Sequence, residues 1–156
     1  MGKTDLAVFF DGELAGVHMK ERILSCNEVS EKYGLSLNRE QAAALVQVCG
    51  ETLKKTGRIE MGDGIADRII LEFCDSSYIS AENYEDLLGK FIELFYRFKN
   101  ETHDIISDAD LIRFMKSEFD GFCAGSEDLL AQRLTELAKH INNGKTFESF
   151  YCGGGR

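Results

Sequence analysis

Proline is absent from this 156-residue sequence, although an average globular composition would supply about eight. The residue that most strongly interrupts helices is therefore missing. Amphipathic segments take its place, and most of them begin at a Ser, Asn or Gly and end near a Gly. This pattern predicts a nearly all-helical domain, and it identifies no chemistry by itself.

Long apolar runs are also absent. No segment approaches the ~18 apolar residues of a membrane-spanning helix, and no apolar core of a secretory signal follows the first residues. Position 6 is Leu6, which does not fit the myristoylation pattern. We therefore expect a cytoplasmic protein with no membrane partner.

Basic residues are too few to balance the acidic ones, so the net charge is −9 and the pI is about 4.8. The average field repels nucleic-acid phosphates and anionic lipids, which disfavours a nucleic-acid partner. The five cysteines form no CxxC pair. They are expected to be reduced and to act as small hydrophobic residues, and a disulfide framework or a zinc cluster is the weaker alternative.

Helix start signals divide the chain into five to seven short amphipathic helices in one all-α domain over residues 1–152. The predicted N-caps are Ser25, Asn38, Ser107 and Ser126. Residues 153–156 are expected to be a disordered Gly-rich tail. Residues 1–24 are less regular, and they fit a helix with a break or a short strand.

The clearest predicted helix runs from residue 80 to about residue 100. Its core face recurs at intervals of three and four, at Tyr84, Leu88, Phe91, Phe95 and Phe98. Ile92 and Tyr96 fall beside this stripe, and Phe114 and Phe122 are further surplus aromatics. We expect these four residues to form an exposed surface for self-association or for a protein partner. A core assignment that is slightly out of phase would give the same pattern.

Five segments resemble an uncharacterised domain family of small cytoplasmic proteins from anaerobic Firmicutes. They are ILSCNE at 23–28, KYGLSL at 32–37, GRIEMGDGI at 57–65, FCDS at 73–76 and FYRFKNE at 95–101. The resemblance covers residues 23–135. It implies a bacterial cytoplasmic protein and supplies no activity, cofactor or catalytic residue.

Residues 28–41 fit a helix-turn-helix pattern, with Gly34 in the turn. Arg39 is the only basic residue at the start of the second helix, and Glu40 occupies a position that should face inward. Because DNA affinity depends on cationic side chains, two ordinary helices are the favoured interpretation. A transcription-associated DNA-binding protein is the alternative.

One acidic loop could carry chemistry. Its candidate ligands are His103, Asp104, Asp108 and Asp110. An imidazole and three carboxylates could bind a divalent cation, or the imidazole could act as a general base. The spacing matches neither an EF-hand nor a zinc motif, so a metal- or small-ligand-binding protein is only a further alternative and no cofactor is predicted.

The remaining motifs are weak. Gly62-Asp63-Gly64 lacks the Lys-Ser/Thr of a phosphate-binding P-loop and predicts a tight turn. His18 and His140 are isolated, and His140 is expected to cap the end of its helix. No nucleophile motif is present. The leading prediction is a non-enzymatic interaction or oligomerisation module that acts through the helix at 81–100.

Overall fold

The computed structural model describes residues 16–59 and 64–154, and no strand occurs within these ranges. The predicted all-α class is therefore confirmed. A helix covers residues 16–25, and it is followed by α2 (Asn27–Ser30), the 3₁₀-helix η1 (Glu31–Tyr33), α3 (Arg39–Thr56), α4 (Ala66–Phe73), α5 (Tyr84–Glu101), α6 (Asp108–Asp120), α7 (Glu127–Asn142) and α8 (Phe147–Gly154).

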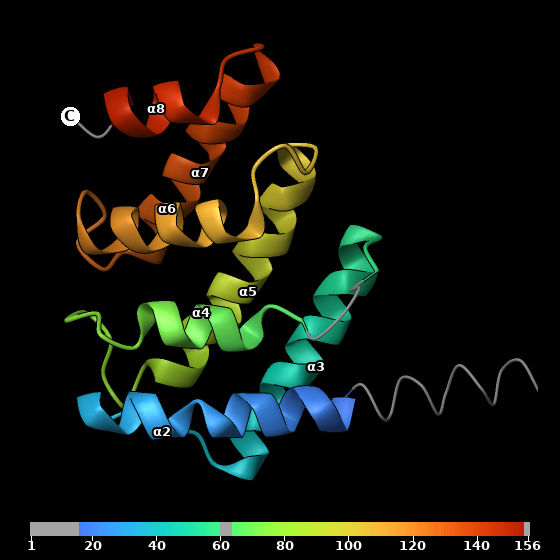
Figure 1. Ribbon diagram of the computed structural model, residues 1–156, viewed down its shortest axis with the longest axis vertical. Coiled ribbons are helices and arrows are strands. Elements are labelled where there is room, and N and C mark those ends of the chain that lie inside the picture. The colour runs from blue at the N-terminus through green and yellow to red at the C-terminus, as the bar shows by residue number, and fades with distance from the viewer. Residues whose placement is uncertain (1–15, 60–63, 155–156) are drawn as a thin grey trace, which may run out of the picture.

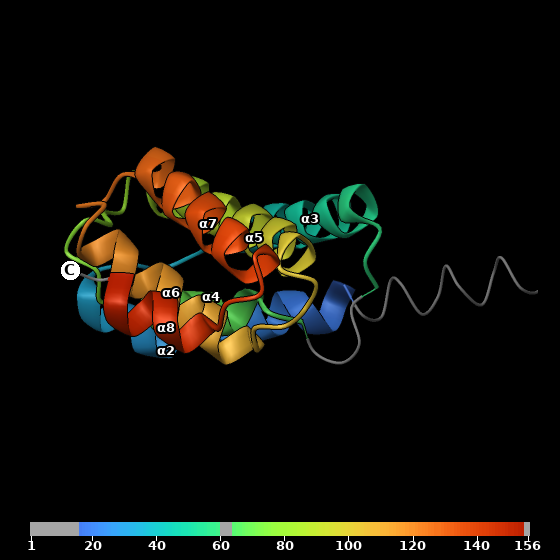
Figure 2. The same ribbon diagram turned by 90° about the horizontal axis from the view of Figure 1, so that it is seen from above.

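The helices form two layers (Figures 1 and 2). α2, α4, α6 and α8 lie side by side in one layer, while α3, α5 and α7 form the other. The chain alternates between the layers, so that successive helical hairpins stack on one another, as they do in helical-repeat proteins. α5 lies between α3 and α7 and also contacts α4 and α6, which makes it the central helix.

The core lies between the two layers and is rich in aromatic side chains. The rings of Phe73 and Phe91 are stacked with centroids 4.0 Å apart, and Phe119 meets the edge of both rings. These side chains come from α4, α5 and α6, as the apolar spacing of each segment predicts. Such aromatic packing joins the two layers through the middle of the molecule.

Most of the predicted helix caps are confirmed. Asn38 and Gln41 form a reciprocal capping box at the start of α3, and Ser107 and Ser126 cap α6 and α7. Gly57 ends α3 with a φ of 67°, a left-handed conformation that glycine adopts without strain.

The predicted cap at Ser25 is wrong. Ser25 is the last residue of the helix over 16–25, and its hydroxyl donates to the carbonyl oxygen of Arg22 at 2.7 Å. A serine hydroxyl that is bonded within its own helix is not available to cap the next one. α2 therefore follows Cys26, which makes no side-chain capping bond.

The two chain ends give mixed outcomes. The part of residues 1–24 that the structure describes, from residue 16 onward, is helical, whereas residues 1–15 lie outside the described ranges. α8 extends through Gly154, so the first two residues of the expected disordered tail are helical. Residues 155–156 lie outside the described ranges.

Candidate interaction groove

The predicted aromatic surface is mostly buried. Ile92, Tyr96 and Phe114 are each exposed by 1% or less, so the expectation of an exposed ridge is wrong for these three residues. The reason is that α5 is enclosed by four other helices. Side chains on several sides of α5 are therefore buried, and not only those of the single apolar stripe that the sequence analysis assigned to the core.

Phe122 differs from the other three, because 69% of it is exposed. It lies in the turn between α6 and α7, and the guanidinium of Arg133 lies 5.4 Å from the centre of its ring. The same guanidinium lies over the ring of Phe150 and donates to Glu118 at 2.6 Å. Phe122 thus covers one side of an arginine that links α6, α7 and α8.

The acidic loop between α5 and α6 faces cations. Arg58 donates two hydrogen bonds to the carboxylate of Asp104, at 2.7 and 3.1 Å, and lowers the pKa of that carboxyl below its usual value. Asp108 pairs with the buried Lys99 at 2.9 Å, and Asp110 pairs with Arg113 at 2.6 Å.

These pairs explain the loop without a metal. No group of three or more potential metal ligands occurs among the described residues. Lys99 also donates to the carbonyl oxygen of Ile106 at 2.6 Å, which fixes the loop against the end of α5. The structure therefore assigns the candidate carboxylates to ion pairs with three different cations.

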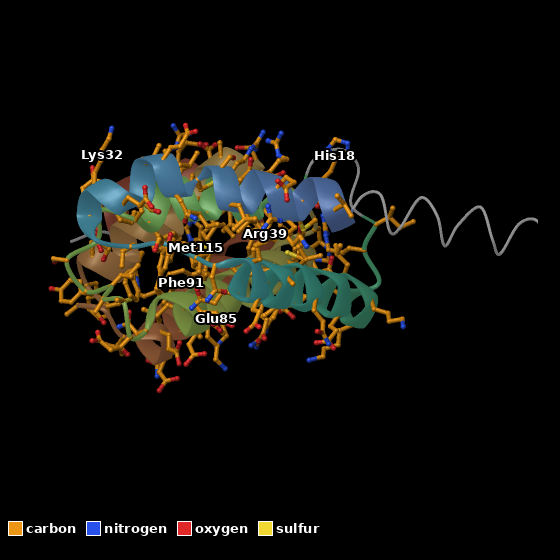
Figure 3. The ribbon with its side chains drawn as sticks, turned by 90° about the horizontal axis from the view of Figure 1, so that it is seen from below. His18, Lys32, Arg39, Glu85, Phe91 and Met115 are labelled. Atoms are coloured by element: carbon orange, nitrogen blue, oxygen red, sulfur yellow. The ribbon has the colours of Figure 1, made fainter. Side chains whose placement is uncertain are left out.

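The helix-turn-helix candidate contains ordinary structural contacts. Figure 3 shows Arg39 between the helix over 16–25 and α3, and its guanidinium pairs with Glu21 at 3.2 Å. Asn38 and Gln41 are used in the capping box, while Glu40 is exposed rather than facing inward. The cation at the start of α3 is therefore paired with a carboxylate in this structure.

The glycine-rich turn is only partly visible. Gly62 and Asp63 lie outside the described ranges, whereas Gly64 precedes α4 with a φ of 88°. The side chains of His18 and Lys32 lie at opposite ends of the segment that the helix over 16–25, α2 and η1 form together (Figure 3).

His140 connects two helices instead of capping one. Its Nε2 lies 2.8 Å from the carbonyl oxygen of Thr146 and 2.7 Å from Oγ of Ser149. The expected interaction with the carbonyl groups of α7 is therefore replaced by contacts to the beginning of α8. The Ser149 hydroxyl itself donates to Thr146 at 2.9 Å, so this pair bridges a connection between helices.

The thiols of Cys26, Cys74 and Cys123 are buried and protonated at neutral pH. Burial raises the pKa of Cys26 and of Cys123 to about 11, and it also raises the pKa of Cys74. Cys49 is also buried. These environments suit small hydrophobic residues and not nucleophiles, because the thiolate is the reactive form.

A groove follows the outer face of α5. The first part, about 420 Å³, lies between α3 and α5 and reaches the beginning of α7. Its lining comprises Ala44, Leu45, Val48, Glu85, Asp86, Gly89, Lys90, Glu93 and Glu127. The second part, about 220 Å³, lies between α5 and α7; it shares Lys90, Glu93 and Glu127 and adds Leu94, Arg97, Asp128 and Ala131. We call the two adjoining parts the α5 groove.

Gly89 leaves the floor of the α5 groove open. A Cβ atom at this position would meet only Cγ2 of Val48, at 4.0 Å. A glycine inside a helix costs about 1 kcal/mol relative to alanine. At this position the missing side chain leaves space between α3 and α5.

Carboxylates dominate the edges of the groove. They belong to Glu85, Asp86, Glu93, Glu127 and Asp128. None of the five makes an ion pair or a side-chain hydrogen bond with the described part of the chain. Four of them lie in the first turns of α5 and α7, where the helix dipole stabilises negative charge. The local sequence therefore brings two acidic helix starts together beside Glu93.

A hollow in the opposite layer has a different charge. It measures about 420 Å³ between α4 and α6, and its charged lining consists of Arg68, Arg113 and Glu72. The acidity of the α5 groove is consequently a local property and not only a reflection of the net charge of the chain.

The sequence analysis did not predict the α5 groove, although the sequence contains a signal for it. Gly89 interrupts the polar side of the helix that the sequence predicts from residue 80 to about residue 100. Glu85 lies four positions before Gly89, Asp86 three before it and Glu93 four after it. These spacings place all three carboxylates near Gly89 on one helical face. A glycine surrounded by carboxylates in this way indicates an open acidic surface.

The domain defined by these features is a stack of amphipathic helices with an acidic groove. The chain belongs to the family of unknown function DUF6323, whose model matches residues 22–147. This match confirms the resemblance to an uncharacterised family, and the expected source in anaerobic Firmicutes stays a prediction. No curated protein and no solved structure matches the chain. None of the described helices is long and apolar enough to cross a bilayer.

Proposed function

We propose that this protein is a non-enzymatic interaction module and that the α5 groove binds a segment of a partner protein. One observation carries this proposal: the groove combines an open floor at Gly89 with carboxylates that have no partner among the described residues. Small apolar floors with polar rims are typical of protein-binding surfaces.

The chemistry of the lining supports binding over catalysis. The groove residues supply carboxylates, two cations and small apolar groups, but no histidine, cysteine or serine. The thiols of Cys26, Cys74 and Cys123 are held in the protonated form by burial. The α5 groove therefore lacks the hydroxyl, thiol and imidazole groups of a Ser-His or Cys-His catalytic pair.

A different protein is the favoured partner, and self-association is the alternative. A second copy would bring another chain with a net charge of −9 to an acidic groove, and like charges at an interface oppose association. Phe122 is the remaining exposed residue of the predicted interaction surface and is available for a separate contact. We also propose a cytoplasmic location, which the buried thiols of Cys26, Cys74 and Cys123 support, because they form no disulfide.

Two glycine variants test the proposed function. Gly89→Leu fills the groove, whereas Gly50→Leu places the same side chain on an exposed part of α3 where a Cβ meets nothing within 4 Å. Each protein is immobilised on a resin and incubated with an extract of the source cells. The captured proteins are then quantified by mass spectrometry. We expect a partner that the wild type and Gly50→Leu retain and that Gly89→Leu loses by at least about tenfold. Equal recovery by all three proteins would contradict the proposal.

A further inference from the structure

We propose that the occupant of the α5 groove is a cationic amphipathic helix of the partner protein. This inference rests on the proposed function and adds the chemistry and the conformation of the bound segment. Three properties of the groove carry it: the sign of its charge, the size of its floor residues and its direction along α5.

The charge of the groove selects a cationic segment. Five carboxylates line it, and only Lys90 and Arg97 oppose them. Because the carboxylates have no ion-pair partner within the described ranges, they repel one another in the free protein. Lysine or arginine side chains of a partner would relieve this repulsion and accelerate encounter.

The floor of the groove favours a partner segment whose apolar side chains can approach α3, α5 and α7 closely. Ala44 and Val48 of α3, Gly89 and Leu94 of α5, and Ala131 of α7 supply the apolar surface. Small side chains allow a third helix to approach the α3–α5 and α5–α7 pairs at ordinary helix-packing distances of about 8–10 Å. A partner helix with apolar residues at every third or fourth position and cations on both flanks matches this surface.

The length of the groove fits a short helix. Its lining extends along α5 from Glu85 to Arg97, which corresponds to about 18 Å at 1.5 Å per residue, or three to four helical turns. The walls are helices, whose backbone groups are bonded internally, and no strand edge occurs in the described ranges. An extended peptide would therefore find no backbone partners for strand addition.

Three labelled synthetic peptides of sixteen residues test this inference by fluorescence anisotropy. The first places leucine at helical intervals with lysine on the flanks. The second has the same composition in an order without helical periodicity, and the third replaces lysine by glutamate. We expect the first peptide to bind and to gain helical circular dichroism on binding. We expect the second to bind at least about tenfold more weakly and the third not to bind.

Variants of the protein locate the binding. Gly89→Leu blocks the floor and Glu93→Lys reverses one charge on the edge, so each should weaken the first peptide by about tenfold or more. Gly50→Leu should bind it like the wild type. Equal binding of the ordered and scrambled peptides would overturn the inference, because it would show diffuse electrostatic attraction, and so would binding that is insensitive to Gly89→Leu. Retained native circular dichroism shows that each variant is folded.

The two proposals can fail separately. A captured partner that is lost in Gly89→Leu, but whose cross-linked segment is acidic or extended, would overturn the cationic helix and leave the interaction module in place. If Gly89→Leu changes neither partner capture nor peptide binding, both proposals are wrong.

Discussion

Two acidic regions of this molecule have opposite arrangements of charge. Where α5 leads into α6, Asp104 of the loop and Asp108 at the start of α6 face Arg58 and Lys99 at ion-pair distances. In the α5 groove, five carboxylates lie close together, and none has an ion-pair partner among the described residues. Carboxylates of the first kind stabilise the fold. Those of the second kind remain available to a ligand.

The two lysines of α5 show the same contrast. Lys99 is 5% exposed, and its ammonium donates to Ile106 and pairs with Asp108. Lys90 is exposed on the edge of the groove and makes no ion pair with the described residues. A buried cation that satisfies several acceptors costs much more to remove than an exposed one.

The largest difference is therefore expected between Lys99→Met and Lys90→Met. Loss of the Lys99 ammonium leaves the Ile106 carbonyl and the Asp108 carboxylate without their partner, which should lower the free energy of unfolding by about 2 kcal/mol. Lys90→Met should change it by less than about 0.5 kcal/mol. Urea denaturation followed by circular dichroism measures both values, and equal effects would contradict the contrast.

A smaller effect is expected from Asp104→Asn, compared with Glu93→Gln in the groove. Asp104→Asn weakens the bond to Arg58 and should cost about 0.5–1 kcal/mol at neutral pH, since Asp104 is partly exposed. Glu93→Gln should not lower the free energy of unfolding, because Glu93 makes no ion pair with the described residues.

The pH dependence gives this comparison a direction. Arg58 lowers the pKa of Asp104 in the folded protein, so its stabilisation is complete well above the unfolded pKa of about 3.9. It is lost as the pH falls through the lower folded value. Asp104→Asn should therefore approach the wild type in stability at acid pH. A cost of Asp104→Asn that is the same at acid and neutral pH would show that the ion pair with Arg58 does not contribute.

Replacing the groove glycine should separate stability from binding. Gly89→Leu and Gly50→Leu each remove a glycine from the interior of a helix and should raise the free energy of unfolding by about 0.5–1 kcal/mol. Thermal unfolding measures this gain, and destabilisation by Gly89→Leu would mean that the groove floor is less open than its contacts show.

The smallest expected effect is that of ionic strength on Glu93→Gln. Glu93→Gln removes one negative charge from the groove and should stabilise the protein by about 0.3 kcal/mol in low salt. This gain should disappear in about 1 M NaCl, where the Debye length is about 3 Å. Denaturation curves at the two salt concentrations provide the test, and an unchanged gain would contradict an electrostatic origin.

Local signals in the sequence predicted much of the fold. The caps at Asn38, Ser107 and Ser126 use side chains that bond to backbone three residues away, so the sequence alone reveals them. The burial of Ile92 and Tyr96 could not be read in this way. It depends on how many helices surround α5, and that is a property of the assembled layers.

The functional site was harder to predict, because pairing across the chain decides it. Asp104 is a structural residue since Arg58, 46 positions away, reaches it. Glu93 and Glu127 are available because the two cations of the groove, Lys90 and Arg97, make no ion pair with the described residues. Sequence spacing showed where carboxylates concentrate and could not show which of them are paired.

The most direct test of the α5 groove is an NMR titration of the ¹⁵N-labelled protein with the ordered lysine–leucine peptide. We expect the largest amide shift changes at residues 44–48, 85–97 and 127–131, with saturation at stoichiometric peptide. The paired loop at 102–108 should remain unchanged. Shift changes that are distributed over both acidic regions, or that are concentrated at the paired loop, would contradict the account.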